Sequence, residues 1–128
     1  MATQDPQIHD GGNLTASADL SSNQFFAVKI TAGRQVGLVS AATDKAYGIL
    51  QNKPKSAQAA DVALFGITKA YAGGSVTAGH LLGVDTSGRV VEFVTSSGNM
   101  AVGYAIEAGQ VSQNVTMFLF PAPFNVGH

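Results

Sequence analysis

Histidine side chains are the first place to look for acid–base or metal chemistry in this chain, which has three of them and no cysteine. His9 lies near the amino end, His80 follows a glycine, and His128 is the final residue. None stands in an HxH or HxxxH spacing or beside a paired carboxylate, so the pattern predicts no metal ligand set. Without cysteine there are no disulfides, thiolate metal sites or cysteine nucleophiles. We therefore expect neither a metal nor a cofactor.

One segment resembles the active-site signature of aspartic proteases. Val84–Gly88 reads Val-Asp-Thr-Ser-Gly, which is the apolar-Asp-Thr-Gly pattern with one residue inserted. That mechanism needs a carboxylate held at a fixed turn opposite a second copy, and the insertion changes the turn. A β-turn with Asp85 at its first position and Gly88 at its last explains the same residues. We interpret the segment as a hairpin turn.

The glycine-rich segment Gly73–His80 could, in principle, bind a phosphate. No lysine follows it and no helical pattern begins after it, and a phosphate loop needs one or the other. The chain also has no Gly-x-Ser-x-Gly sequence of the kind that places a hydrolase serine. With no acid–base or nucleophile constellation, the sequence predicts that this protein is not an enzyme.

The charge content points toward protein partners. Only 12% of the 128 residues are charged, 45% are hydrophobic, and the formal net charge is -1. This balance favours neither nucleic acid nor an anionic membrane surface. A surface with so few charges is typical of one that meets other protein. No apolar run reaches the length of a membrane span, and the amino end lacks the pattern of a signal peptide, so we expect synthesis in a cytoplasm.

Two groups of apolar side chains are candidates for binding. The segment 1–23 is polar, with Ile8, Leu14 and Leu20 as its only large aliphatic residues, and we expect an arm that is flexible alone or ordered by a partner. The final strand, Val115–Phe120, has large apolar groups on both faces, and a further aromatic residue follows it. A strand of this kind is either enclosed in the core or buried by a neighbouring subunit. The candidate subunit-interface residues are Phe118, Phe120 and Phe124.

The elements that position these residues are predicted to be strands. Short apolar runs alternate with turn residues every 8 to 12 positions, and no segment of helical length has a helical period. The predicted strands are 24–31, 35–40, 46–50, 61–69, 81–85, 89–94, 100–107 and 115–120, with Pro121 and Pro123 expected to end the pairing. The prediction is an all-β fold: a small β-sandwich or partly open β-barrel of seven to eight short strands. An extended N-terminal arm, 1–23, precedes this β domain, 24–128.

The order of several short motifs resembles that of the head decoration, or capsid cement, proteins of tailed bacteriophages. The resemblance covers roughly residues 24–120 and depends on pattern more than on one diagnostic motif. The motifs that carry it are Tyr47–Pro54 (YGILQNKP), Val62–Lys69 (VALFGITK), Val76–Leu82 (VTAGHLL), Asp85–Arg89 (DTSGR) and Ala101–Ala105 (AVGYA).

The resemblance implies a structural virion protein, made in the host cytoplasm, that binds the outer surface of a capsid and stabilises it. Its implied partners are the major capsid protein and further copies of itself, with a trimer favoured over a dimer. Multivalent attachment of that kind strengthens weak single contacts. Ile8, Leu14 and Leu20 would then be the capsid contacts of the arm, which could add a strand to a capsid sheet. Two alternatives remain open: another phage component, such as a tail or baseplate protein, and a carbohydrate-binding β-sandwich module.

Overall fold

The computed structural model describes residues 5–9, 14–94 and 99–125, with side chains described at 14–94 and 99–120. These residues form strands and turns and contain no helix, which confirms the all-β prediction. Their ten strands join in one mixed sheet whose path runs β2-β4-β3-β5-β6-β10-β9-β7-β8, with β1 paired to β6 beside that path. The two end strands, β2 and β8, do not pair with each other, so the sheet is open and not a closed barrel.

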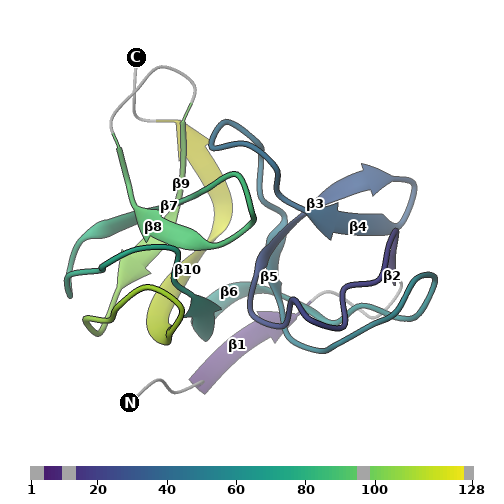
Figure 1. Ribbon diagram of the computed structural model, residues 1–128, viewed down its shortest axis with the longest axis horizontal. Coiled ribbons are helices and arrows are strands. Elements are labelled where there is room, and N and C mark those ends of the chain that lie inside the picture. The colour runs from purple at the N-terminus through teal and green to yellow at the C-terminus, as the bar shows by residue number, and fades with distance from the viewer. Residues whose placement is uncertain (1–4, 10–13, 95–98, 126–128) are drawn as a thin grey trace.

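The strand bounds follow the alternating segments of the sequence. The strands are β1 Asp5–His9, β2 Thr15–Ala16, β3 Ala27–Ala32, β4 Gln35–Leu38, β5 Gly48–Leu50, β6 Val62–Tyr71, β7 Leu81–Val84, β8 Val90–Glu92, β9 Met100–Ala105 and β10 Asn114–Asn125. Figure 1 shows β2 to β5 on one side and β7 to β10 on the other, with β6 running between the two groups.

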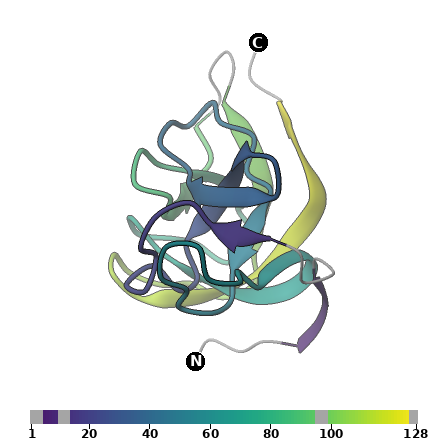
Figure 2. The same cartoon turned by 90° about the vertical axis from the view of Figure 1, so that its right-hand side faces the viewer.

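Strand β6 joins the two halves because three strands share its two edges. Its first residues pair with β5 and its later residues pair with β10. Strand β1 pairs with residues 63–67 of β6. Within this range Ala63 also pairs with β5, and Ile67 also pairs with β10. Since a strand residue has only two edges, β1 lies on the edge of β6 opposite to β5 and β10. Figure 2 shows β1 at the bottom of the molecule, while β10 rises to the top.

The buried side chains form two clusters, of which the larger joins the two halves. The larger cluster lies between β3, β5, β6, β7, β9 and β10, and its large members include Ile49, Leu82, Val102, Met117 and Leu119. The smaller cluster packs β2 to β6 and contains Leu14, Leu20, Val28, Val36, Leu50 and Val62. The buried polar residues Thr68 and Thr116 are hydrogen-bonded through their hydroxyls, to Gln51 and Glu107 respectively, so neither is left unpaired in the core.

The segment before residue 24 contributes to this packing. Thr15 and Ala16 pair in parallel with Gln35 and Val36, and the Leu20 amide donates a hydrogen bond to the Pro54 carbonyl at 2.9 Å. Leu14 is 6% exposed and Leu20 is 3% exposed, which places both side chains in the core. Residues 14–20 are thus folded onto the β domain. The predicted division of the chain at residue 23 stays a prediction.

Strand β10 continues beyond the point where the prolines were expected to end it, so that expectation is wrong. Phe124 and Asn125 pair with Ala101 and Met100 of β9. The pairing of β10 with β9 shifts register between Leu119 and Phe124, and both prolines fall inside that irregular stretch. A proline lacks the N–H that a regular ladder uses, so an irregular edge segment tolerates it. On the other side, β10 pairs with β6 only through Leu119.

A partly exposed ion pair ties β3 to the β4–β5 connection. Lys29 Nζ lies 2.8 Å from Asp44 Oδ2, and the same oxygen accepts hydrogen bonds from the Ser40 and Ala41 amides. The hydrogen bond from Lys29, followed by that from the Ser40 amide, lowers the pKa of Asp44 from 3.8 to about 2. The charged carboxylate therefore stabilises the folded connection.

We expect this ion pair to make stability depend on pH in the acid range. Because the folded pKa of Asp44 is lowered, its contribution is fully present above about pH 4 and is lost as the pH falls toward 2. Asp44→Asn should therefore be less stable than the wild type at pH 7, and the two should converge near pH 2. Urea unfolding at a series of pH values measures the difference, and a constant gap across that range would contradict the assignment.

Candidate functional site

The protease-like segment is a hairpin turn, as the sequence analysis interpreted it. Asp85 Oδ1 accepts hydrogen bonds from the Ser87 and Arg89 amides at 2.8 and 2.9 Å, and its Oδ2 lies 2.9 Å from Arg89 Nε. Gly88 has a φ of 80°, in the left-handed region that glycine adopts without strain. The Gly88 carbonyl accepts the Ala27 amide at 2.7 Å, so the turn also fastens β7 and β8 to β3. Both carboxylate oxygens of Asp85 are thus engaged in holding the turn.

His80 forms an exposed pair with Glu92. His80 Nδ1 lies 3.1 Å from Glu92 Oε2, which also accepts the Thr77 amide at 2.7 Å. The hydrogen bond from His80, with those from Thr77, lowers the pKa of the Glu92 carboxyl. This pair secures the loop between β6 and β7 against β8. Across the described part of the chain, no group of three His, Asp or Glu side chains is placed to hold a metal ion.

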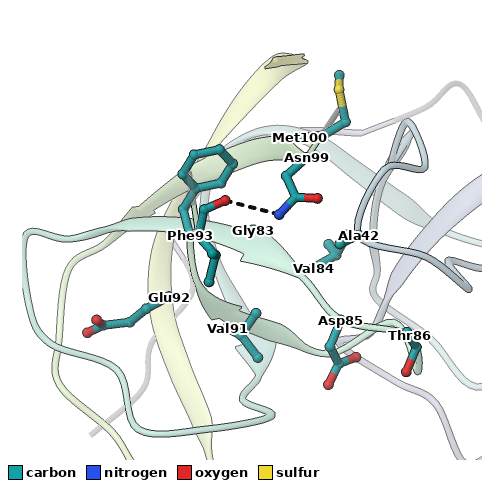
Figure 3. A pocket seen from close by; sticks show the side chains of 11 residues that line it. Ala42, Gly83, Val84, Asp85, Thr86, Val91, Glu92, Phe93, Asn99 and Met100 are labelled. Carbon is teal, nitrogen blue, oxygen red and sulfur yellow. Dashed lines mark hydrogen bonds between the residues drawn. The ribbon is translucent and has the colours of Figure 1, made fainter. Parts of the chain in front are cut away.

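A pocket of about 260 Å³ lies between β7, β8, β9 and the connection that contains Ala42. Its wall is mainly apolar, and Asn99 Nδ2 donates a hydrogen bond to the Val94 carbonyl at its rim. Figure 3 shows the two carboxylates, Asp85 and Glu92, at opposite ends of the pocket. Each is already hydrogen-bonded within its own turn or loop, so the pocket holds no acid–base pair.

The described residues also include no helix that could cross a membrane.

Aromatic side chains form the most distinctive surface of the molecule. Phe118 and Phe120 of β10, Phe65 of β6 and Tyr104 of β9 lie on three neighbouring strands, and we call these four residues the aromatic strip. Their rings contact edge to face: the centroids are 5.4 Å apart for Phe65 and Phe118, 6.3 Å for Phe118 and Phe120, and 5.2 Å for Tyr104 and Phe120. Such contacts fix the orientation of the rings, and they stabilise the structure by more than the burial of their apolar area alone.

The strand register places the aromatic strip on the outer face of the sheet. Phe118 pairs directly with Ile67 of β6 and with Tyr104 of β9, so all three side chains project from the same face. The neighbouring residues of β10, Met117 and Leu119, are buried on the inner face. Tyr104 is 47% exposed, whereas Phe118 and Phe120 are half-buried, so the strip presents a partly uncovered apolar surface.

Gly103 allows β9 to lie close to β10 beneath this surface. A Cβ atom at Gly103 would collide with the Phe118 carbonyl and approach the Met117 side chain. In β9 the small residues Ala101 and Ala105 face the core, whereas Tyr104 faces outward. Val102 breaks the alternation and is 1% exposed, because the pairing of β9 with both neighbours is irregular at this position.

The predicted site residues fall into separate places. Phe118 and Phe120 share the aromatic strip, while Phe124 lies farther along β10 and its side chain is outside the described residues. Leu14 and Leu20 are buried in the smaller core cluster and are not displayed to a partner in this structure. Ile8 belongs to β1, where its backbone pairs with Phe65 of β6, and its side chain is also outside the described residues.

The sequence analysis missed two members of the strip, Phe65 and Tyr104. Phe65 lies in the segment 61–69, which the sequence analysis predicted as a strand without assigning an exposed face to it. In the structure Phe65 and Ile67 are only half-buried, whereas Thr68 is fully buried on the opposite face. Phe65 and Tyr104 are identified only by the register of β6 and β9 with β10, and a single sequence does not contain that register.

The described residues thus form an all-β protein with a partly exposed aromatic strip, and the comparisons with known proteins give its class. A family model described as phage cement protein matches residues 7–118. The chain therefore belongs to the phage cement protein family: it is a non-enzymatic, virion-associated head decoration protein that binds the capsid. No curated protein matches the sequence.

Among solved structures, the chain is similar to the head fiber gp8.5 N base of bacteriophage phi29. The TM-score is 0.66 at 15% sequence identity, and the match covers 94% of this chain and 99% of the other. At that identity the likeness shows a shared fold over nearly the whole chain.

Proposed function

We propose that the protein attaches to the outer surface of the capsid as a closed homo-oligomer, a trimer in its simplest form, and stabilises the shell. The observation that carries the self-association is the aromatic strip. It is a connected set of large apolar rings on a protein in which only 12% of residues are charged. Aromatic residues are enriched at the energetic centres of protein interfaces. A closed ring of subunits buries such a surface without open-ended growth.

Strand β1 supports the second part of the proposal, a capsid contact by the amino-terminal arm. Among the described strands, β1 pairs with β6 alone, so its outer edge has unused backbone donors and acceptors. A strand edge of this kind can pair with a strand of another protein. Leu14 and Leu20 anchor the following segment in the core. We therefore place the capsid contact in residues 1–12, with Ile8 as its large aliphatic residue.

The role of the strip in self-association is tested by placing a charge on it. Tyr104→Glu and Phe120→Glu should each weaken subunit association by at least about thirtyfold, the loss expected for an interface residue worth about 2 kcal/mol. Ile30→Glu is the matched control, because Ile30 and Tyr104 are both 47% exposed and Ile30 lies on β3, in the other half of the sheet. Light scattering coupled to size-exclusion chromatography reports the mass of each variant.

Two results would reject the interface. One is a Tyr104→Glu protein whose mass profile over a dilution series equals that of the wild type. The other is an Ile30→Glu protein that dissociates to the same extent, since that would indicate a general effect of surface charge. Circular dichroism of each variant separates dissociation from unfolding.

A further inference from the structure

A second pocket, of about 330 Å³, lies where the turn before β3 meets the end of β6 and the start of β10. The residues that line it come from four separate segments: Ser21, Ser22, Gln24, Phe25 and Phe26 from the turn, Lys53 from the β5–β6 connection, Tyr71 from β6 and Asn114 from β10. It is apart from the aromatic strip, none of whose residues lines it. The capsid-binding proposal does not use it.

Aromatic rings form one part of this pocket. Phe26 and Tyr71 stack with centroids 5.0 Å apart and planes inclined by 13°, while Phe25 packs against the larger core cluster with Lys69 Nζ 5.5 Å from its ring centroid. Both stacked rings are half-buried, so part of their apolar surface is open to the pocket. Each ring covers one face of the other, so only the outer faces and edges of the pair can contact the C–H face of a sugar ring.

Polar groups without protein partners form the rest. Within the described part of the chain, the side chains of Ser22, Lys53 and Asn114 and the hydroxyl of Tyr71 make no hydrogen bond or ion pair. Hydroxyl and amide groups can each donate and accept, and the lysine adds further donors. Gln24, in contrast, is fixed by a hydrogen bond of 2.8 Å from its Nε2 to the Gln51 carbonyl. Ser22, Lys53 and Asn114 are exposed to solvent, so their polar groups are free to reach a ligand with many hydroxyls.

Phe25, which lines the pocket, is one of four described non-glycine residues with a positive φ. Phe25 has a φ of 70°, a left-handed conformation that is unusual for a bulky residue. Two backbone hydrogen bonds hold it there, from the Phe25 amide to the Leu50 carbonyl at 2.7 Å and from the Tyr71 amide to the Phe25 carbonyl at 2.9 Å. Strained backbone of this sort gathers at binding sites.

We propose that this pocket binds a short saccharide, with Phe26 and Tyr71 as the stacking surface and Lys53, Asn114 and Ser22 as hydrogen-bonding groups. A pocket of this volume is at the small end of the range for ligand sites, which fits one or two sugar rings. The inference is independent of capsid attachment, because it concerns the free protein and different residues.

The test is a titration of the isotope-labelled protein with two probes, neutral chitotriose and anionic trigalacturonate, followed by amide chemical shifts. We expect saturable shifts confined to the residues around the pocket, with a dissociation constant on the order of 1 mM. Lys53→Ala and Asn114→Ala should each weaken binding of the better probe about fivefold, as for the loss of one hydrogen bond. Lys55→Ala is the matched control, since Lys55 is exposed, lies two positions away and does not line the pocket.

Binding of either probe with this pattern supports the proposal, and the preferred probe tells whether the saccharide carries acid groups. The proposal is wrong if neither probe shifts the pocket amides at about ten times that concentration, or if the Lys55→Ala and Lys53→Ala proteins bind alike. It is also wrong if the pocket amides respond only to added capsid shells, which would assign the pocket to capsid attachment.

Discussion

Deletion of residues 2–20 is expected to prevent stable folding, whereas deletion of residues 2–12 is expected to leave the β domain folded. The longer deletion removes Leu14, Ala16 and Leu20, which are buried beside Val28, Val36 and Val62. Loss of one buried leucine side chain costs about 2–5 kcal/mol. Two such losses approach the whole free energy of unfolding of a small domain, about 5–15 kcal/mol.

The shorter deletion removes β1 and keeps the buried leucines. Thermal unfolding followed by circular dichroism compares the two truncated proteins with the full chain. Leu14→Ala and Leu20→Ala in the full chain check the cause, and each should lower stability by about 2–5 kcal/mol. A 2–20 deletion that unfolds at the wild-type temperature would show that residues 14–20 do not belong to the folded domain.

Capsid attachment is expected to fall by at least about a hundredfold when residues 2–12 are removed. The physical reason is multivalency: an oligomer bound by several arms loses every arm contact at once, and the effects multiply. Each arm offers the free outer edge of β1, which pairs with β6 on its inner edge only. Removing β1 leaves the aromatic strip in place, so the oligomer should persist and only the capsid contact should weaken.

Most of the strands could be predicted from the sequence because their side chains alternate. The segments that became β3 to β9 each have turn residues at their ends, such as Ala32–Arg34 and Asp85–Gly88. The three failures, which are β1, β2 and the end of β10, have a common physical cause, since each involves pairing that depends on distant residues; β1 pairs with β6. β2 is two residues long and forms because β4 is beside it, and the end of β10 tolerates prolines because its register with β9 is irregular.

The site was only partly predictable for the same reason. The alternation of Val115–Phe120 indicated that Phe118 and Phe120 share a face, and the structure confirms that they do. It could not indicate that Phe65 and Tyr104 lie beside them, because those contacts depend on how β6 and β9 align with β10. Likewise, nothing local in the sequence distinguishes Leu20, which is buried, from a leucine displayed by a mobile arm.

The most direct test of capsid attachment is co-sedimentation of the full-length protein and the 2–12 deletion with undecorated, expanded shells of the phage that encodes this protein. We predict saturable binding of the full-length protein, a rise in the temperature at which the shells break, and at least about a hundredfold weaker binding of the truncated protein. Equal binding of the two proteins would place attachment in the β domain and reject the role of β1. Full-length protein that stays in the supernatant and leaves the shells no more stable would contradict the central claim.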